Sequence, residues 1–393
     1  MSKEMKLIPE LRFPEFEKDG EWETESLGDV ADVYQPKTIS QTDLSEEGYP
    51  VYGANGIIGF YHEYNHETNQ IAIACRGSSC GTVNFTKPKS WITGNAMVVN
   101  VDQFNKIDKE FMFFQLDHAN LDYLVTGSGQ PQITGSIKKH EVFIPPLKEE
   151  QQKIASCLSS LDELIAAHKE KLDALKDHKK GLLQNLFPQE GETVPKLRFP
   201  EFEGDGEWIY KRLGETGKII TGKTPSTKDA SLWNGEILFI TPTDIDENQK
   251  YQLVTNRTIV RNRKLNILPE GSIAYTCIAS IGKMSITAKE SVTNQQINSI
   301  VVNANYHNEF IYYSLLHITP FIKSRPATST LPIVNKTEFS AFRIAVPKPQ
   351  EQQKIASCLS SLDEAIEAQA EKIEQLQQHK KGLMQGLFPK IES

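Results

Sequence analysis

Apolar residues recur at alternating intervals of four and three in two long stretches of the chain. The first series is Ile154, Leu158, Leu161, Ile165, Leu172, Leu175, Leu182 and Leu186. The second series is Ile355, Leu359, Leu362, Ile366, Ile373, Leu376, Leu383 and Leu387. Polar residues interrupt both series at the same places, His168 and Lys179 in the first and Gln369 and Lys380 in the second. Heptad spacing of this kind is typical of coiled-coil helices.

Both stretches lack an internal proline and end in Leu-Phe-Pro, where proline stops a helix. We therefore predict two helices of about 37 residues, each roughly 55 Å long. A bundle core inside a globular domain is the alternative. Pairing between the two copies explains more, since a whole segment separates them and lets them lie antiparallel within one chain. His168 and Gln369 are then polar seam residues that specify register, and Cys157 and Cys358 lie too far apart for a disulfide.

The two segments that precede these helices, residues 23–148 and 209–347, show a different pattern. Short β-like runs such as Ile71–Ala74 alternate with Gly, Asn and Pro, which is typical of strands joined by turns. A helix-like stretch follows in each segment, Phe111–Leu116 in the first and Phe310–Leu316 in the second. We predict an α+β fold, with two mixed, mostly-β domains separated by two long antiparallel coiled-coil helices in a pseudo-twofold arrangement.

Two blocks of sequence occur twice. Pro9–Glu17, which contains Leu-Arg-Phe-Pro-Glu-Phe, returns as Pro195–Glu203, and the helix start Gln151–Glu163 returns almost unchanged as Gln352–Glu364. A repeat keeps what packing requires and varies its binding faces, so the layout indicates a two-headed recognition protein on a symmetric frame. The predicted domains are a first head with an N-terminal docking segment (1–148), a first spacer helix (149–188), a second head with the repeated docking segment (189–348), and a second spacer helix with a tail (349–393).

Charge and cysteine usage narrow the class of protein. The net charge is −8, but residues 23–148 hold nine lysines and arginines against fifteen acidic residues, whereas residues 209–347 hold sixteen against ten. Local charge decides nucleic-acid binding more than the total does, so the second segment is the better electrostatic candidate. The five cysteines lack the spacing of zinc ligands, and no apolar run has the length of a membrane helix. We expect a cytoplasmic protein with free thiols, no metal and no membrane contact.

The sequence contains one apparent nucleotide-binding motif, which its surroundings argue against, and it lacks the common catalytic motifs. Residues 217–224 match the phosphate-loop pattern, but that loop follows a buried strand and opens a helix. Here Ile219 and Ile220 are strand-like, and Pro225 begins a turn. An ATP-dependent enzyme is therefore only a minor alternative. The Asn-Pro-Pro-aromatic and Asp-Pro-Pro-aromatic tetrapeptides of adenine methyltransferases are absent, as are Gly-x-Ser-x-Gly and His-Glu-x-x-His. We expect a non-catalytic protein.

Polar and basic side chains of the two segments are candidates for DNA contacts, because amide, guanidinium and hydroxyl groups read base edges and bind phosphates. The candidates in the first segment are Asn55, Arg76, Ser128, Gln130 and Gln132. Those in the second are Lys223, Thr224, Ser226, Arg257, Arg261, Arg263, Lys264, Ser280, Lys283, Thr328, Ser329 and Thr330. A solvated surface position is the ordinary explanation for any one of them. As a set on two heads with a fixed spacer, they favour a split DNA target.

Together these features resemble the specificity subunit of type I restriction-modification systems over essentially the whole chain. The residues that carry the resemblance are the paired Leu-Arg-Phe-Pro-Glu-Phe blocks, the turns at 53–59 and 221–226, the Glu-Gln-Gln-Lys-Ile-Ala helix entries and the two Lys-Lys-Gly-Leu sequences. The resemblance implies two target-recognition domains, each reading one half of a split asymmetric DNA sequence, with the helices as a ruler. It also implies double-stranded DNA, two methyltransferase subunits and, in the full complex, restriction subunits as partners.

The resemblance further implies methylation at adenine N6 of a base flipped into the partner's pocket. S-adenosylmethionine would belong to the methyltransferase, and ATP and Mg²⁺ to the restriction subunit, so this chain is expected to bind no cofactor itself. The acidic first segment disfavours DNA binding by this segment alone, and a partner that supplies much of the contact with the DNA backbone would account for it. The rival hypothesis is a non-catalytic interaction scaffold that bridges two protein partners through the coiled coil.

Overall fold

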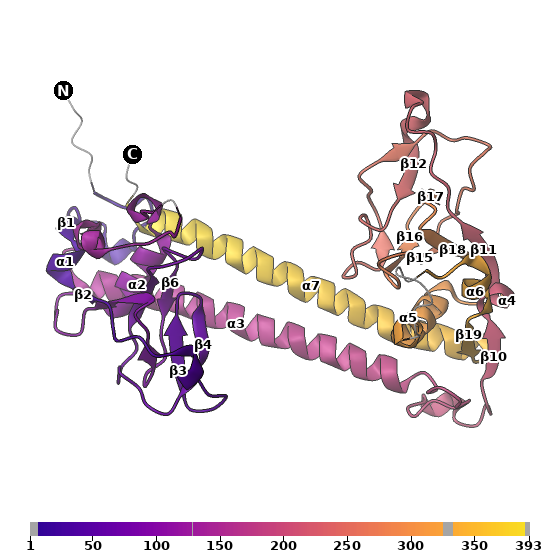
Figure 1. The fold of residues 1–393 in the computed structure, drawn as a ribbon, viewed down its shortest axis with the longest axis horizontal. Coiled ribbons are helices and arrows are strands. Elements are labelled where there is room, and N and C mark those ends of the chain that lie inside the picture. The colour runs from indigo at the N-terminus through magenta and orange to yellow at the C-terminus, as the bar shows by residue number, and fades with distance from the viewer. Residues whose placement is uncertain (1–6, 128, 325–332, 390–393) are drawn as a thin grey trace. The chain divides into compact units, whose positions relative to one another are not determined.

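The computed structural model describes residues 7–127, 129–324 and 333–389 (Figure 1). The chain divides into two compact units. Unit 1 consists of residues 1–169 and 371–393, and unit 2 consists of residues 170–370. Each unit therefore combines one variable segment with parts of both long helices. No helix in the described part of the chain is long and apolar enough to cross a membrane.

The two long helices predicted from the heptad pattern are present. Helix α3 spans Lys148–Asn185 and helix α7 spans Pro349–Leu387, with 38 and 39 residues. Nine of the predicted seam residues are buried, namely Ile154, Leu158, Ile165, Leu186, Ile355, Leu359, Ile373, Leu376 and Leu387. The other seven are partly buried, namely Leu161, Leu172, Leu175, Leu182, Leu362, Ile366 and Leu383. The apolar series thus faces inward along both helices, as expected of a coiled coil.

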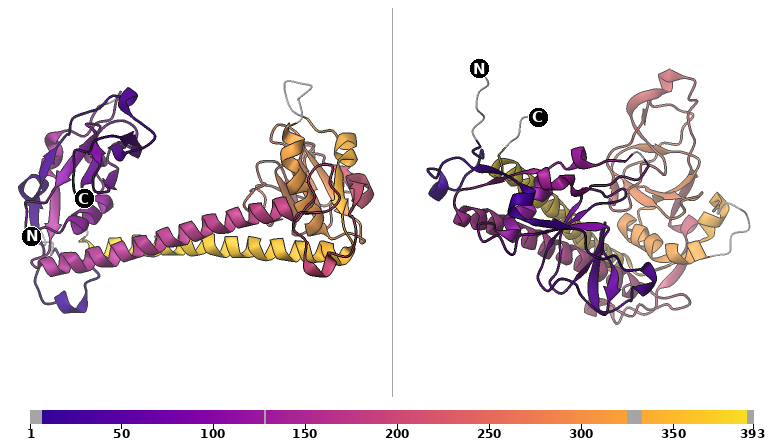
Figure 2. Two further views of the ribbon diagram at one scale, coloured as in Figure 1. Left: turned by 90° about the horizontal axis from the view of Figure 1, so that it is seen from below. Right: turned by 60° about the vertical axis from the view of Figure 1, so that its left-hand side comes forward.

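The helices pack antiparallel, and the lysines that interrupt the apolar series join them. In unit 1, Lys380 of α7 donates to both carboxylate oxygens of Asp162 of α3 at 2.6 and 2.7 Å. In unit 2, Lys179 of α3 forms an ion pair with Asp363 of α7. Figure 2 shows the two helices side by side. The same ion pair thus occurs in both units, with the lysine on α7 in unit 1 and on α3 in unit 2. The internal repeat of the sequence is therefore also a repeat of contacts.

Unit 1 contains a four-stranded antiparallel sheet, a three-stranded mixed sheet and a two-stranded pair. The first sheet has the order β2 (Asp32–Tyr34), β8 (Ala96–Asn100), β5 (Ile71–Ala74) and β6 (Val83–Phe85). The second has the order β4 (Gly56–Tyr61), β3 (Tyr49–Gly53) and β7 (Trp91–Ile92), with β3 and β7 parallel. Strand β1 (Glu23–Ser26) pairs with β9 (Glu141–Ile144). The helices are α1 (Leu27–Val30), α2 (Lys109–His118) and the 3-10 turns η1 (Pro14–Phe16), η2 (Gln41–Asp43), η3 (Asp122–Leu124) and η4 (Gly135–Lys139).

Unit 2 repeats this plan with one more strand. Its main sheet has the order β11 (Gly217–Thr221), β18 (Ile297–Val302), β15 (Ile273–Thr276), β16 (Met284–Thr287) and β13 (Tyr251–Gln252). The small sheet has the order β14 (Thr258–Ile259), β12 (Trp233–Ile240) and β17 (Ser291–Thr293). Strand β10 (Ile209–Arg212) pairs with β19 (Arg343–Val346). The helices are α4 (Leu213–Thr216), α5 (Asn308–Ser324), α6 (Lys336–Ala341), η5 (Pro200–Phe202) and η6 (Ala230–Leu232). The predicted runs at 71–74, 111–116 and 310–316 are confirmed as β5 and as parts of α2 and α5.

The repeated Leu-Arg-Phe-Pro-Glu-Phe blocks fasten the start of one long helix to the end of the other. In unit 1, Arg12 donates through Nε and Nη2 to both oxygens of Glu150 at 2.8 and 2.7 Å. The neighbouring Leu11 N–H donates to the carbonyl of Gly386, near the end of α7, at 2.8 Å. The two charged side chains are only 5% and 1% exposed. Bidentate pairing of this kind constrains geometry as well as energy, which is a physical reason for the block to occur twice.

Unit 2 makes the same fastening with the helices exchanged. Arg198 donates to both oxygens of Glu351, the first-turn acid of α7, at 2.8 Å each. Leu197 N–H donates to the carbonyl of Asn185, at the end of α3, at 2.9 Å. An aromatic cluster packs beside each fastening, formed by Trp22, Phe111 and Phe388 in unit 1 and by Trp208, Phe310 and Phe187 in unit 2.

Candidate nucleic-acid interface

Four loops meet at the end of strand β5 in unit 1. Gln35 Nε2, after β2, donates to Cys75 Sγ at 3.0 Å and to the carbonyl of Gly94 at 3.4 Å. The N–H of Cys75 donates to the carbonyl of Asn95 at 3.0 Å, and the N–H of Ile133 donates to the carbonyl of Cys75 at 3.1 Å. Backbone and side-chain bonds therefore gather loops that are far apart in sequence. We call residues 35–38, 75–82, 93–95 and 129–133 the loop cluster of unit 1.

Unit 2 builds the same junction around Cys277, at the end of β15. The N–H of Lys223 donates to the carbonyl of Thr293 at 2.8 Å, and the N–H of Cys277 donates to the carbonyl of Gln296 at 2.8 Å. The N–H of Val334 donates to the carbonyl of Cys277 at 2.9 Å. The two backbone bonds of Cys277 match those of Cys75, whereas the first loop is joined through the backbone of Lys223 in unit 2 and through the side chain of Gln35 in unit 1. The loop cluster of unit 2 consists of residues 222–226, 277–283, 293–296 and 333–334.

The cysteine at the centre of each cluster is structural. Cys75 and Cys277 are buried, and all five cysteines are free thiols. Burial raises the pKa of the Cys277 thiol to about 11, so the thiolate needed of a nucleophile or metal ligand is not formed at neutral pH. Among the residues that the structure describes, no group of three or more His, Cys, Asp and Glu side chains is placed to hold a metal ion. The clusters therefore offer hydrogen bonds and shape rather than reactive groups.

The most informative difference between the units lies at one equivalent position. In unit 1, the residue after Cys75 is Arg76, which forms an isolated antiparallel bridge with Gln132. In unit 2, the residue after Cys277 is Ile278, which forms the same kind of bridge with Ile333. The backbone arrangement is thus kept while a guanidinium and an amide are replaced by two apolar side chains. A frame that holds its backbone and changes its exposed groups is what a sequence-reading surface requires.

The structure places eight of the predicted DNA-contacting residues, all that it describes outside the small sheets, in the two loop clusters. In unit 1, Arg76, Gln130 and Gln132 are exposed in the cluster. The members in unit 2 are Lys223, Thr224, Ser226, Ser280 and Lys283. The hydroxyl of Thr224 donates to Gln295 Oε1 at 2.6 Å, and the carbonyl of Ser226 accepts from the indole N–H of Trp233 at 3.0 Å. The hydroxyl of Thr276 holds the β15–β16 turn through the carbonyls of Ser280 and Lys283. The predicted contacts Ser128, Thr328, Ser329 and Thr330 lie outside the described residues.

The remaining candidates belong to the small sheet of each unit. Asn55 is exposed at the tip of the β3–β4 hairpin in unit 1. In unit 2 the basic group lies around β14. Arg257 directly precedes the strand, and Arg261, Arg263 and Lys264 follow it. The guanidinium of Arg257 lies over the ring of Trp233, 4.3 Å from its centroid, and Arg261 forms an exposed ion pair with Glu290. Arg263 and Lys264 are exposed. Sequence proximity made one cluster of these four residues, but the first two already have intramolecular partners.

The phosphate-loop match has no nucleotide-binding geometry. Residues 217–221 form strand β11, and the next element along the chain is the 3-10 turn η6. A Cβ on Gly222 would lie 2.1 Å from the carbonyl oxygen of Asn294, so this glycine is required by the close approach of two loops. The glycine therefore serves the loop cluster and leaves no open nest for a phosphate.

Several residues of the site were missed in the sequence. Gln35, Asn95, Gln295 and Gln296 lie in the loop clusters, and each contributes an amide or a carbonyl to the bonds that join the loops. Their common signal is an amide residue within two positions of the end of one strand or the start of the next. A single such residue is frequent in ordinary turns, so only the tertiary convergence of the loops identifies the set.

Comparisons with known proteins agree with this architecture. A family model described as type I restriction modification DNA specificity domain matches residues 19–177 and 205–378. The chain is 23% identical over 395 residues to the putative type I restriction enzyme MjaX specificity subunit of Methanocaldococcus jannaschii, covering 93% of this chain and 92% of that protein. It is 25% identical over 362 residues to the EcoR124I/EcoR124II specificity subunit of Escherichia coli, covering 86% of this chain and 85% of that protein.

A solved structure has the same fold. The type I restriction-modification S subunit from M. genitalium superposes with a TM-score of 0.70 at 17% identity, covering 98% of this chain and 100% of that one. At this identity the likeness concerns the fold, and the family match rests on the sequence model, which covers both variable segments and most of both long helices. The duplicated frame, the two antiparallel helices and the two loop clusters are therefore those of a chain that belongs to the type I restriction modification DNA specificity family.

Proposed function

We propose that this chain is the DNA sequence-recognition subunit of a type I restriction-modification complex, and that each variable segment reads one half of a split asymmetric target. The observation that carries the proposal is the equivalent position in the two loop clusters, occupied by Arg76 and Gln132 in unit 1 and by Ile278 and Ile333 in unit 2. A guanidinium and an amide suit hydrogen bonding to base edges, whereas isoleucine suits apolar contact such as that with a thymine methyl group. Two unlike surfaces on one repeated frame imply two unlike half-sites.

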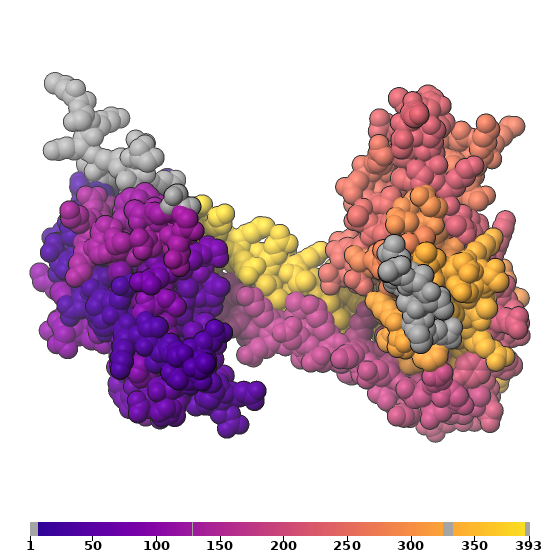
Figure 3. Space-filling view, viewed as in Figure 1, coloured from indigo at the N-terminus to yellow at the C-terminus, as the bar shows by residue number. Residues whose placement is uncertain are grey.

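The helices support the assignment of protein partners. From Ala166 to Gly181 no side chain of α3 is buried, and part of this helix is seen in magenta in Figure 3. Because the frame is duplicated, the proposal includes two methyltransferase subunits, one for each copy, and restriction subunits in the full complex. The partners would hold S-adenosylmethionine, ATP and Mg²⁺ and would methylate adenine or cut unmodified DNA. This chain would then contribute recognition without catalysis, in the cytoplasm.

The test is long-read sequencing of adenine methylation in cells that carry the cognate methyltransferase, with and without this chain. We expect a split motif that is methylated only when the chain is present, and its two halves and gap would be obtained together. Arg76→Ala should change or abolish methylation at motifs defined by one half-site. If the chain assembles with the methyltransferase but no motif depends on it, the proposal is wrong, and a scaffold role explains the duplicated frame better.

A further inference from the structure

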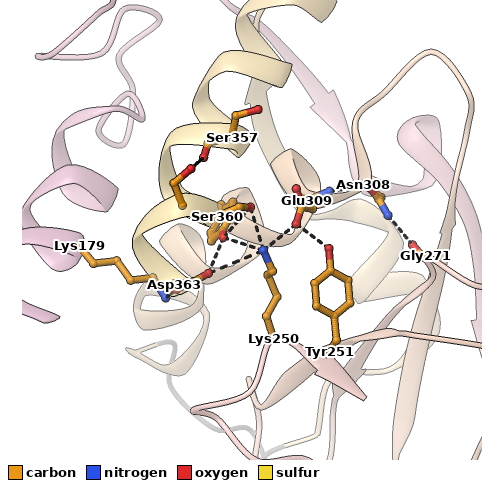
Figure 4. Close-up of polar contacts among 11 residues, drawn as sticks. Lys179, Lys250, Tyr251, Gly271, Asn308, Glu309, Ser357, Ser360 and Asp363 are labelled. Atoms are coloured by element: carbon orange, nitrogen blue, oxygen red, sulfur yellow. Dashed lines mark hydrogen bonds and ion pairs between the residues drawn. The ribbon is translucent and has the colours of Figure 1, made fainter. Parts of the chain in front are cut away.

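A largely buried lysine of the second variable segment, Lys250, is bound by helix α5 of the same segment and by helix α7 of the frame (Figure 4). The ammonium group of Lys250 donates to Glu309 of α5 at 2.6 Å and to the hydroxyl of Ser360 of α7 at 2.8 Å, and it lies 4.0 Å from Asp363 of α7. Its side chain is only 10% exposed. Lys250 therefore has its hydrogen-bonding capacity used inside the protein and is not a free cation for DNA.

The surrounding groups balance this charge and connect three helices. The hydroxyl of Tyr313 of α5 donates to Asp363 at 2.5 Å, and Lys179 of α3 pairs with the same carboxylate. The hydroxyl of Tyr251 donates to Glu309 at 2.7 Å. Although burial alone would raise it, the hydrogen bonds from Lys250 and Tyr251 lower the pKa of Glu309 below its ordinary value. Two cations thus face two carboxylates, and the network ties the segment, α5, α7 and α3 to one point.

Unit 1 has the equivalent ion pair between the two long helices, but different side chains of its variable segment lie beside that pair. Lys380 pairs with Asp162 across the helices and lies over the ring of Phe114, 5.1 Å from its centroid, at the place where unit 2 has Tyr313. Its acid at the start of α2, Glu110, accepts from the hydroxyl of Ser159 at 2.9 Å. The variable segment of unit 1 contacts α2 through its edge strand β6, where the rings of Phe85 and Phe113 lie 5.1 Å apart.

Because Lys250 lies next to an edge strand of the sheet, its contacts hold that edge in place. Lys250 directly precedes β13, the edge strand of the five-stranded sheet, and its carbonyl accepts from the N–H of Ile286 of the neighbouring strand β16 at 2.8 Å. The opposite edge strand, β11, directly follows β10 and α4 along the chain. The sheet that carries the loop cluster of unit 2 is therefore held at its β13 edge by directional, charge-assisted hydrogen bonds.

We propose that Lys250 is a positioning residue that holds the main sheet of the second variable segment against α5 of that segment and against α7 of the frame, and thereby sets how strictly the gap between the two half-sites is read. The inference rests on the proposed function. One base pair corresponds to about 3.4 Å of rise and about 35° of rotation in B-DNA. A recognition segment that could tilt by this much at its loop cluster would accept half-sites one base pair nearer or farther. The Lys250 network resists such a tilt because moving the sheet edge separates buried charges.

The test measures gap strictness directly. Methylation maps are recorded for the complex with the wild-type chain and with Lys250→Met, and methylation of the cognate motif is compared with that of motifs whose gap differs by one base pair. We expect the altered-gap motifs to gain about tenfold relative to the cognate motif, equivalent to about 1.4 kcal/mol. Lys250→Arg, which keeps a positive charge with several N–H donors, should keep the wild-type ratio.

The matched control is Lys109→Met in unit 1. Lys109 is similarly buried, with a side chain 16% exposed, and binds Asp102 at 2.5 Å and the carbonyl of Asn69 at 2.7 Å. These partners all belong to its own variable segment, whereas Lys250 also contacts Ser360 and Asp363 of α7, so this variant removes a comparable ion pair without touching the frame. It should lower stability while leaving the gap ratio unchanged. An equal gap ratio in wild type, Lys250→Met and Lys109→Met would overturn the inference.

If Lys250→Met fails to fold, a second variant still tests the inference. The double variant Lys250→Met/Glu309→Gln removes both charges and should assemble even if the single variant does not, with the same relaxed gap. If neither assembles with the methyltransferase while Lys109→Met does, Lys250 is needed for folding and the positioning role is refuted. A wild-type chain that directs no split motif would refute the proposed function itself, whereas a split motif with unaltered strictness in the variants would refute only the inference.

Discussion

Arg12→Met should destabilise unit 1 strongly, because it leaves the carboxylate of Glu150 buried without a cation. Both oxygens of Glu150 accept from Arg12, and the Glu150 side chain is 1% exposed. Removing one partner of such a buried pair costs about 3–5 kcal/mol. The variant also loses the 2.7 Å bond from Arg12 to the carbonyl of Gly20. Among the described residues, Arg12 is the cation that forms an ion pair with this carboxylate.

A second variant separates the unpaired charge from the loss of packing. In Arg12→Met/Glu150→Leu both charges are replaced by apolar groups, and such replacements of a whole buried pair are often neutral. The double variant should therefore be more stable than Arg12→Met alone. The difference between the single and double variants measures the cost of the unpaired carboxylate.

Calorimetry provides the measurement, since each unit has its own core. A loss of about 3–5 kcal/mol should lower the unfolding temperature of unit 1 by roughly 6–20 °C. Arg198→Met is the matched control, because the Arg198–Glu351 pair has the same geometry and burial in unit 2. It should lower the other transition by a similar amount. A shift below about 2 °C for Arg12→Met, equivalent to less than about 1 kcal/mol, would refute the reasoning.

Three further predictions concern the seam, pH and DNA. Leu158→Ala should lower the free energy of unfolding by about 2–5 kcal/mol, since Leu158 is fully buried. Leu175→Ala should lower it clearly less, because Leu175 is only partly buried. Urea unfolding measures both, and equal losses would contradict the observed burial. Burial lowers the pKa of His66 and His140, so below about pH 6.5 the unfolded chain takes up protons that folded unit 1 does not. Its stability should then fall with falling pH by up to about 1.4 kcal/mol per histidine and pH unit, and less in His140→Gln; an identical fall in both proteins would show that His140 is not responsible. Arg263→Ala should reduce the salt slope of DNA binding by the assembled complex by about one, and an unchanged slope would remove Arg263 from the interface.

Local patterns in the sequence carried much of the architecture. The heptad series predicted both long helices because a period of 3.5 is a property of neighbouring residues and needs no knowledge of the partner. The repeated blocks predicted a symmetric frame for a similar reason, since each block contains its own aromatic and charged residues. Short apolar runs predicted strand β5, and short helix-like runs predicted parts of α2 and α5.

Only the tertiary structure decided which side chains meet. Lys179 and Lys380 stand in the sequence as interruptions of an apolar series, and their carboxylate partners lie on the other long helix. Lys250 is separated by 110 positions from Ser360, to which it donates, so no local pattern marks it as an anchor. The loop clusters are likewise assembled from loops that are each unremarkable alone. Periodicity fixes which face of an element is apolar, but hydrogen bonds and ion pairs between distant residues exist only once the elements have packed, because their strength depends on burial and on distances of about 3 Å.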